Sequence, residues 1–230
     1  MPELPGYLRG VYTTLVPRPL RGGLERVLRG PYPRVFDRRR FVFVHIPTTG
    51  AKSRGRVTGV RGAGHLAYRD YEDLIGERLR DYFVFTVVRE PLERLRSSYA
   101  YLDRGGNGSR DDRELKRRWL DPQPDFDAFV CNVLPNAEVF GSRKFKPQAD
   151  YLLGADGRLP AALRILRYES LDEDFRHVAA RLGLDPTLPR VNVTRRGRDR
   201  LGLSPQGLAR VMTLYRRDYE LFGYPPPQPR

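Results

Sequence analysis

Two short apolar runs, each followed by polar residues and then a helical pattern, dominate the hydrophobic patterning of the chain. Phe41–Ile46 (FVFVHI) and Phe83–Val88 (FVFTVV) are rich in β-branched and aromatic residues, as is typical of strands buried on both faces. Pro47 ends the first run, and Pro91 begins a helix soon after the second. Each run therefore predicts a strand that leads to a helix start, where free backbone N–H groups attract anions.

Helical spacing of apolar residues fills much of the remaining chain. It predicts helices over 71–79, 91–101 and 125–133, and two later ones that begin after Ser170 and at Ser204-Pro205. A third short strand is expected at Leu163–Leu166. Because strands alternate with helices, we expect an α/β protein with a P-loop-like three-layer fold, in which helices flank a central, mainly parallel sheet.

Local signals mark the ends of the two later helices. Ser170 with Glu173 predicts a capping box, and Gly183 predicts the end of the helix that it opens. Ser204 before Pro205 is a helix start, and Gly223 is the matching stop.

The 230 residues are enough for one sizeable α/β core. The Pro-, Gly- and Arg-rich stretch 1–40 predicts an N-terminal arm, 41–224 the folded domain, and 225–230 a disordered tail.

The net charge of +14 comes almost entirely from arginine, because only four of the 42 basic residues are lysines. Such a surface either steers an anionic ligand or is simply a solvated face, and charge alone does not separate the two. The single Cys131 excludes an intrachain disulfide framework, and the three histidines lack metal-ligand spacing, so no metal is expected. No apolar run approaches a membrane span and no signal-like segment begins the chain, so we expect a cytoplasmic protein, or a lumenal one whose anchor was removed.

The first strand–helix junction offers a lysine and a hydroxyl at a predicted helix start. Gly50 and Ala51 allow the backbone to approach a ligand closely, Lys52 supplies a point charge and Ser53 a hydroxyl. GAKS matches only the end of a Walker A loop, because Ile46 stands where that loop needs its first glycine. The alternative is a loop with an incidental lysine, although a chain that otherwise uses arginine has placed one of its four lysines here.

The second junction offers a guanidinium and another hydroxyl. Arg89 follows the second strand directly, and Ser97 lies eight residues later on the predicted helix. Arg89 suits a phosphate or sulfate group as a bidentate donor, and its alternative role is a salt bridge to Glu93 or Glu169. Two such junctions predict two anion subsites bridged by a ligand that is anionic at both ends.

The motifs resemble those of one enzyme family. HIPTTGAKS (45–53) is similar to the 5′-phosphosulfate loop, and FVFTVVREPLERLRSSY (83–99) to the 3′-phosphate motif, of the PAPS-dependent sulfotransferases of the carbohydrate type, which include the heparan 2-O and chondroitin enzymes. The resemblance spans roughly residues 40–224. Further matching segments follow in order: GHLAYRDYEDLIGERLRDY, FKPQADYL, RILRYESLDEDF, LGLDPTLPRVNVTRR and YRRDYELFGY.

This resemblance implies a sulfotransferase that moves a sulfuryl group from PAPS to a hydroxyl of an acceptor, a carbohydrate or small metabolite, and leaves adenosine 3′,5′-bisphosphate. No metal is implied, and we do not expect nucleic acid as a partner. Carried over position by position, the implied nucleotide contacts are Thr48, Thr49, Gly50, Ala51, Lys52, Ser53, Arg89, Ser97, Asn192, Thr194, Arg195 and Arg196.

The resemblance also implies a catalytic base, and the chain departs from the family pattern at one position of the loop. His65 matches the histidine that takes the acceptor proton in the heparan 2-O relatives, while His45 is expected to brace the loop. The family's loop lysine belongs where this chain has Thr48. Either Lys52 has taken over its catalytic role, or the protein is catalytically impaired and still binds the nucleotide.

Two other classes remain open. A nucleotide kinase would share the sheet and the loop, but it needs an acidic magnesium ligand at a strand end, where this chain has Arg89 and Arg167-Tyr168. A protein that only binds acidic glycans or nucleic acid would use the basic surface without turnover.

Overall fold

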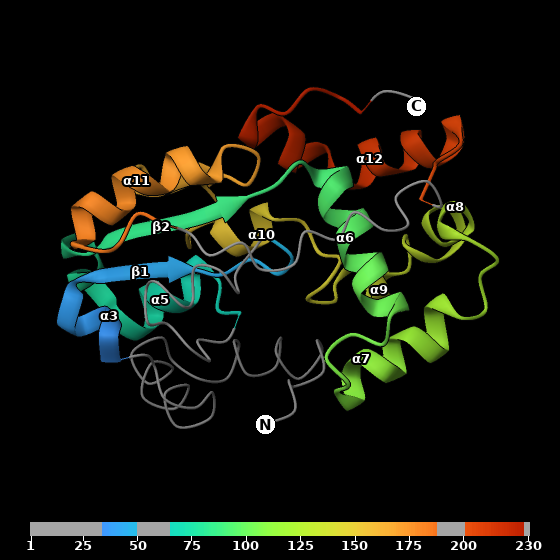
Figure 1. The fold of residues 1–230 in the computed structure, drawn as a ribbon, viewed down its shortest axis with the longest axis horizontal. Coiled ribbons are helices and arrows are strands. Elements are labelled where there is room, and N and C mark those ends of the chain that lie inside the picture. Colours follow the sequence, from blue (N-terminus) through green and yellow to red (C-terminus); the bar gives the residue numbers. More distant parts are fainter. Residues whose placement is uncertain (1–33, 50–64, 188–200, 228–230) are drawn as a thin grey trace.

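The computed structural model describes residues 34–49, 65–187 and 201–227 (Figure 1). Its helices and strands, with η marking 3-10 and π turns, are in chain order α3 (Arg34–Arg39), β1 (Phe41–Val44), α5 (Tyr68–Ile75), η1 (Gly76–Asp81), β2 (Phe83–Val88), α6 (Pro91–Asp103), α7 (Arg110–Leu115), η2 (Lys116–Leu120), α8 (Phe126–Ala128), η3 (Phe129–Val133), α9 (Ala137–Phe140), α10 (Ala149–Leu152), β3 (Arg164–Arg167), α11 (Leu171–Leu182) and α12 (Pro205–Phe222).

The described strands form one parallel sheet in the order β1-β2-β3. Phe41 pairs with Phe83 across the first pair of strands, and Val88 pairs with Arg167 across the second. Every residue of β1 is buried, as the uninterrupted apolar run predicts. The predicted α/β class with a parallel sheet flanked by helices is confirmed.

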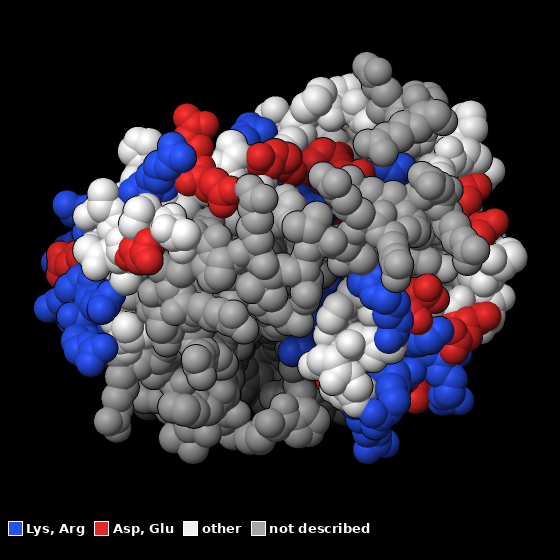
Figure 2. All heavy atoms as spheres, viewed as in Figure 1, with Lys and Arg blue, Asp and Glu red and all other residues white. Residues whose placement is uncertain are grey.

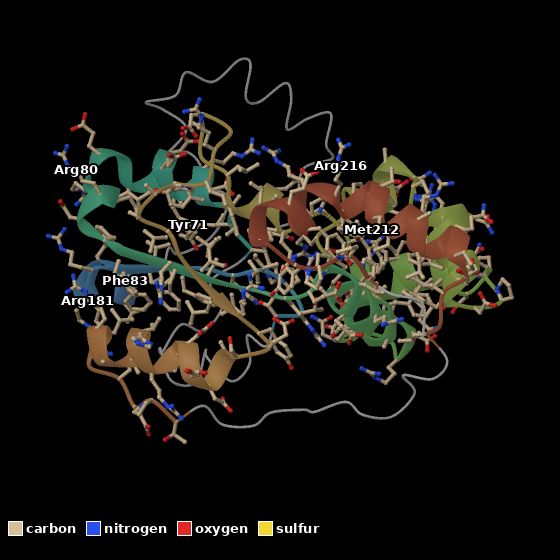
Figure 3. All side chains as sticks on the ribbon, turned by 90° about the horizontal axis from the view of Figure 1, so that it is seen from above. Tyr71, Arg80, Phe83, Arg181, Met212 and Arg216 are labelled. Atoms are coloured by element: carbon tan, nitrogen blue, oxygen red, sulfur yellow. The ribbon has the colours of Figure 1, made fainter. Side chains whose placement is uncertain are left out.

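Helices cover both faces of this sheet. Figures 1 and 3 show α5 on one side of the strands and α11 on the other. Tyr71 of α5 is buried, whereas Arg80 and Arg181 lie at one outer end of the layers (Figure 3). The strands point with their carboxyl ends toward α6 (Figure 1), so residues that follow β1 and β2 meet at that edge.

The core reaches into the stretch expected as an N-terminal arm. Phe36 of α3 is fully buried, and its ring packs edge-on against Phe41 and Tyr71 with ring centroids 5.1 and 6.0 Å apart. The Phe36 side chain therefore anchors α3 against β1.

Helix ends follow the local signals with one exception. Ser204 caps α12 by accepting the Gly207 N–H, and Gly183 and Gly223 end α11 and α12 in the left-handed conformation, with φ of 62° each. The capping box predicted at Ser170 is wrong, because its hydroxyl pairs with the Asp174 carboxylate and not with a backbone N–H. Asp174 also accepts the Arg167 N–H, which draws the Ser170 side chain away from the cap.

Some boundaries differ from the predicted ones. β1 ends at Val44, two residues before the end of the apolar run, and β3 lies one residue later than expected. The helix expected over 71–79 begins at Tyr68 and tightens into a 3-10 turn at Gly76. The pattern over 125–133 forms a short α-helix capped by Asp125 and continues as a π-helix. No helix among the described residues is long and apolar enough to cross a membrane.

Candidate active site

The two junctions that the sequence predicts separately lie next to each other. Because β1 and β2 are parallel neighbours, the loop after β1 and the residue after β2 leave the sheet at the same edge. The Arg89 Nη1 atom donates a hydrogen bond to the Thr48 carbonyl oxygen at 3.3 Å. The guanidinium of the second junction thus contacts the backbone of the first, as two subsites for one doubly anionic ligand require.

Arg89 is held on several sides and is almost fully buried. Its side chain is 10% exposed, its guanidinium lies 4.4 Å from the centroid of the Tyr168 ring, and its backbone is bonded to Gln148. The alternative role as a salt bridge to Glu93 has weak geometry, because the two side chains are 4.0 Å apart while Glu93 approaches Arg96 at 2.8 Å. Glu169, the other alternative partner, accepts the Glu90 N–H at 2.9 Å.

The loop after β1 is turned sharply by its two threonines. Thr48 has a φ of 65°, which a β-branched residue rarely adopts. Its hydroxyl donates to the Pro47 carbonyl at 2.6 Å and lies 3.1 Å from the Ser98 hydroxyl. The buried Thr49 hydroxyl donates to the Ile46 carbonyl at 2.9 Å. Both threonine side chains therefore bond to the protein and shape the turn.

Two adjacent serines of α6 have different surroundings. Ser98 is fully buried, and its hydroxyl donates to the Lys144 carbonyl at 2.9 Å. Ser97, the predicted ligand contact, is only half-buried, and its hydroxyl has no hydrogen-bond partner within the described residues. Ser97 is thus the one of the pair whose hydroxyl is left for a ligand.

Arg94 brings a buried positive charge beneath the loop, a feature that sequence reasoning missed. Its side chain is 2% exposed, and it donates to the Pro47 carbonyl at 3.2 Å and to the Lys146 carbonyl at 2.9 Å. Its Nη2 atom is buried and, within the part of the chain described, has no hydrogen-bond partner. The Arg94 guanidinium is thus bonded to two carbonyls and, among the described residues, keeps one unpaired N–H group beneath the loop.

His65 lies against the end of β1. Its Nδ1 is 3.4 Å from the His45 carbonyl oxygen, and the two imidazole rings lie 4.4 Å apart. Burial lowers the pKa of His65 to about 4, the hydrogen bond to His45 opposes this shift, and the positive charges of Arg143, Lys144 and Lys146 add to it. The imidazole is therefore neutral at pH 7. With its Nδ1 proton donated to His45, the lone pair is on Nε2, as a general base requires.

The cations near His65 lie in or next to FKPQADYL, a segment that matches the family motifs but had no predicted site residue. Lys144 lies over the Tyr101 ring at 4.1 Å and is 3.6 Å from the Asp112 carboxylate, and Lys146 lies over the Tyr151 ring at 3.9 Å. Burial lowers the pKa of Lys144. The signal was present in the sequence, since two of its four lysines fall at these positions. Figure 2 shows further Lys and Arg side chains on the outer surface over α7, interspersed with acidic ones.

Several predicted contacts lie outside the described residues. They are Gly50, Ala51, Lys52, Ser53, Asn192, Thr194, Arg195 and Arg196. Of the predicted set, Thr48, Thr49, Arg89, Ser97 and His65 are described. A hydrogen bond joins Thr48 to Arg89, and the Thr48 hydroxyl lies 3.1 Å from the Ser98 hydroxyl on the helix that carries Ser97. Within the ranges described, no group of histidine, cysteine or acidic side chains could hold a metal ion.

The groups present fit a polyanionic nucleotide. Arg89 offers a guanidinium, Ser97 a hydroxyl, and Arg94 a buried charge with an orphaned N–H group, while no acidic side chain follows β2 or β3 directly. The guanidinium and hydroxyl donors at this edge suit phosphate and sulfate oxygens.

Comparison with known proteins agrees with this chemistry. The family model described as "Sulfotransferase family" matches residues 63–225. The match covers well over half of the chain, so the protein belongs to the sulfotransferase family, whose members transfer sulfuryl groups. No curated protein and no solved structure matches it. The matched range includes His65, Arg89 and Ser97 but begins after the loop that follows β1, so the role of that loop rests on its contact with Arg89.

Proposed function

We propose that this protein transfers a sulfuryl group from PAPS to a hydroxyl group of a carbohydrate or small-metabolite acceptor. The observation that carries the proposal is the 3.3 Å contact between Arg89 Nη1 and the Thr48 carbonyl. It brings the first residues of the predicted phosphosulfate loop next to the cation that follows β2, as a nucleotide with a phosphosulfate at one end and a phosphate at the other requires.

In this proposal the two junctions hold opposite ends of the donor. Thr48–Ser53 surround the 5′-phosphosulfate, with Lys52 as the loop cation, and Arg89 with Ser97 holds the 3′-phosphate. Asn192, Thr194, Arg195 and Arg196 lie in the late segment that closes over the nucleotide. The sulfuryl group carries less charge than a phosphoryl group, so protein cations can balance it without a metal.

His65 then acts on the acceptor. As the acceptor oxygen forms its bond to sulfur, the bond between sulfur and the bridging phosphate oxygen breaks, and adenosine 3′,5′-bisphosphate leaves with that electron pair. The acceptor proton passes to Nε2 of His65, whose neutral state at pH 7 follows from its lowered pKa. The 3.4 Å contact of Nδ1 with the His45 carbonyl fixes the ring orientation for this transfer.

A catalytically impaired nucleotide-binding protein is the second candidate, and Thr48 is the observation that favours it. The threonine stands where the resembling enzymes carry their loop lysine, and its hydroxyl is bonded within the protein. Under this alternative PAPS binds and is not turned over. The kinase alternative has no support, because β2 and β3 run into Arg89 and Tyr168 and not into a carboxylate.

Calorimetric titration of adenosine 3′,5′-bisphosphate tests the proposal. We expect micromolar binding by the wild type, binding weakened by about 10²-fold but still measurable in Arg89→Ala, and no response to ATP with magnesium. Arg80→Ala is the matched control, because Arg80 is 76% exposed and pairs only loosely with Glu77 at 4.0 Å. Absence of binding by the wild type would overturn the proposal. Binding without turnover across a panel of carbohydrate hydroxyl acceptors would instead identify the impaired protein.

A further inference from the structure

We propose that Gln148 is a positioning residue that sets the direction of the Arg89 side chain, and that Asp218 of α12 holds Gln148 in place. The inference rests on the proposed function, because it assigns Gln148 an effect on recognition of the 3′-phosphate.

Gln148 completes the hydrogen bonding of the residue that follows β2. Its Oε1 accepts the Arg89 N–H at 2.9 Å, and its Nε2 donates to the Arg89 carbonyl at 2.7 Å. The strand pairing of β2 with β3 ends at Val88, so Arg89 lies just beyond the ladder. The amide of Gln148 therefore binds Arg89 as a neighbouring strand would, through one donor and one acceptor.

Asp218 fixes Gln148 from the other side. Its two carboxylate oxygens accept the backbone N–H groups of Gln148 at 2.8 Å and Ala149 at 2.9 Å. Asp218 and Gln148 are both fully buried. A buried carboxylate is costly unless its oxygens are hydrogen-bonded, and these bonds go to the start of α10. A connected series of contacts thus runs from the C-terminal helix through Gln148 to Arg89.

Fixing the backbone of Arg89 matters because its guanidinium stands at the end of a flexible side chain. With the backbone held, Nη1 reaches the Thr48 carbonyl at 3.3 Å and the guanidinium lies over the Tyr168 ring at 4.4 Å. A bidentate contact to a phosphate depends on the direction of the guanidinium plane. Loosening the backbone at Arg89 would therefore weaken the 3′-phosphate contact more than the 5′ contacts.

Calorimetry with two nucleotides separates positioning from general stabilisation. We expect Gln148→Met, which keeps the side-chain length and removes both amide bonds, to weaken binding of adenosine 3′,5′-bisphosphate about tenfold, or roughly 1.4 kcal/mol. Binding of adenosine 5′-monophosphate should change by less than about twofold, since this ligand does not use Arg89. Gln206→Met, at an exposed glutamine of α12, is the matched control.

A double-variant cycle shows whether Gln148 acts through Arg89. In the Arg89→Ala background, Gln148→Met should cause no further loss of bisphosphate affinity. Equal losses for both nucleotides, or additive losses in the double variant, would overturn the inference while leaving the proposed function intact. Failure of the wild type to bind the bisphosphate would overturn both.

A second variant guards against misfolding. Gln148→Asn keeps an uncharged amide and places it one methylene short of the Arg89 backbone, so we expect a bisphosphate loss of between about twofold and tenfold. Thermal unfolding of each variant identifies any that does not fold, and the cycle is then run with Gln148→Asn. If Gln148→Asn binds both nucleotides as the wild type does, the inference is wrong.

Discussion

Arg94 and Ser98 lie one helical turn apart on α6, and each joins the loop after β1 to the segment 144–146. Arg94 donates to the Pro47 and Lys146 carbonyls, and Ser98 contacts the Thr48 hydroxyl and donates to the Lys144 carbonyl. Residues four apart share one helix face, so a single face of α6 braces both segments. The cations near His65 and the loop residues Pro47 and Thr48 are thereby fixed relative to each other.

The adjacent serines of α6 should separate stability from binding. We expect Ser98→Ala to lower the free energy of unfolding by about 1 to 2 kcal/mol, because it removes a buried hydroxyl bonded to the Lys144 carbonyl. Ser97→Ala should leave stability within about 0.5 kcal/mol and weaken binding of adenosine 3′,5′-bisphosphate. Urea unfolding and calorimetry measure the two effects. Loss of nucleotide binding in Ser98→Ala with unchanged binding in Ser97→Ala would contradict the assignment of Ser97 as the ligand contact.

Substitution of Arg94 should lower the free energy of unfolding more than most single substitutions. Arg94→Met removes two charge-assisted hydrogen bonds to buried carbonyls and the buried charge near Asp218, so we expect a loss of about 2 to 4 kcal/mol in the free energy of unfolding. Arg78→Met, at an exposed arginine, is the control and should cost less than about 0.5 kcal/mol. Urea unfolding measures both effects. A loss of less than about 1 kcal/mol in the free energy of unfolding for Arg94→Met would show that its hydrogen bonds to Pro47 and Lys146 are dispensable.

The sheet could be read from the sequence because its signal is local. Phe83–Val88 was predicted with its observed bounds, since an uninterrupted β-branched run has few alternatives to a buried strand. The glycines at 183 and 223 marked helix ends because only a left-handed residue closes these turns easily. Ser170 failed as a cap because its competing partner, Asp174, is chosen by tertiary geometry that the capping pattern does not contain.

The sequence predicted the candidate anion-binding residues but not the residues that hold them in place. Arg89 was predicted because a cation directly after a buried strand is unusual, and in the structure the parallel sheet places it beside Thr48. The roles of Arg94 and Gln148 depend on contacts between residues far apart in the chain, namely with Pro47 and with the Arg89 backbone. No periodicity or spacing encodes such contacts, so they required the structure.

Titration of His65 should show a neutral imidazole across the physiological range. Its pKa is lowered to about 4, so the resonances of His65, assigned by comparison with His65→Gln, should shift near pH 4 and not near 6.5 in an NMR titration. A shift centred near pH 6.5 would show that the ring is solvated and not held against His45.

The same lowered pKa has a consequence for stability. The unfolded chain takes up a proton at His65 below about pH 6.5, whereas the folded protein does so only near pH 4, so folded stability is lost as the pH falls between these values. We expect this group to contribute a loss of about 2 kcal/mol, after discounting for partial exposure of the ring. Urea unfolding at pH 7 and at pH 4.5 should show a smaller difference for His65→Gln than for the wild type. Equal differences would contradict the lowered pKa.

Variants at Lys52 and Thr48 distinguish an active enzyme from a catalytically impaired one. Thr48 has a φ of 65° and a hydroxyl bonded to Pro47 and close to Ser98, so position 48 is used to turn the loop and brace it against α6. We therefore expect Lys52 to be the catalytic cation. Lys52→Ala should lower turnover by about 10² to 10³-fold, measured as release of adenosine 3′,5′-bisphosphate from PAPS with a panel of carbohydrate acceptors.

Two further variants test the assignment of Lys52: a control at another lysine and the reciprocal change at Thr48. Lys116→Ala removes a lysine that pairs with Asp121 and should leave turnover unchanged. Thr48→Lys should not raise turnover, and it should lower the free energy of unfolding by about 1 kcal/mol, because the loop loses its hydroxyl contacts and still places an L-residue at positive φ. A gain of turnover in Thr48→Lys, with little effect of Lys52→Ala, would show instead that the threonine is what impairs the wild-type protein.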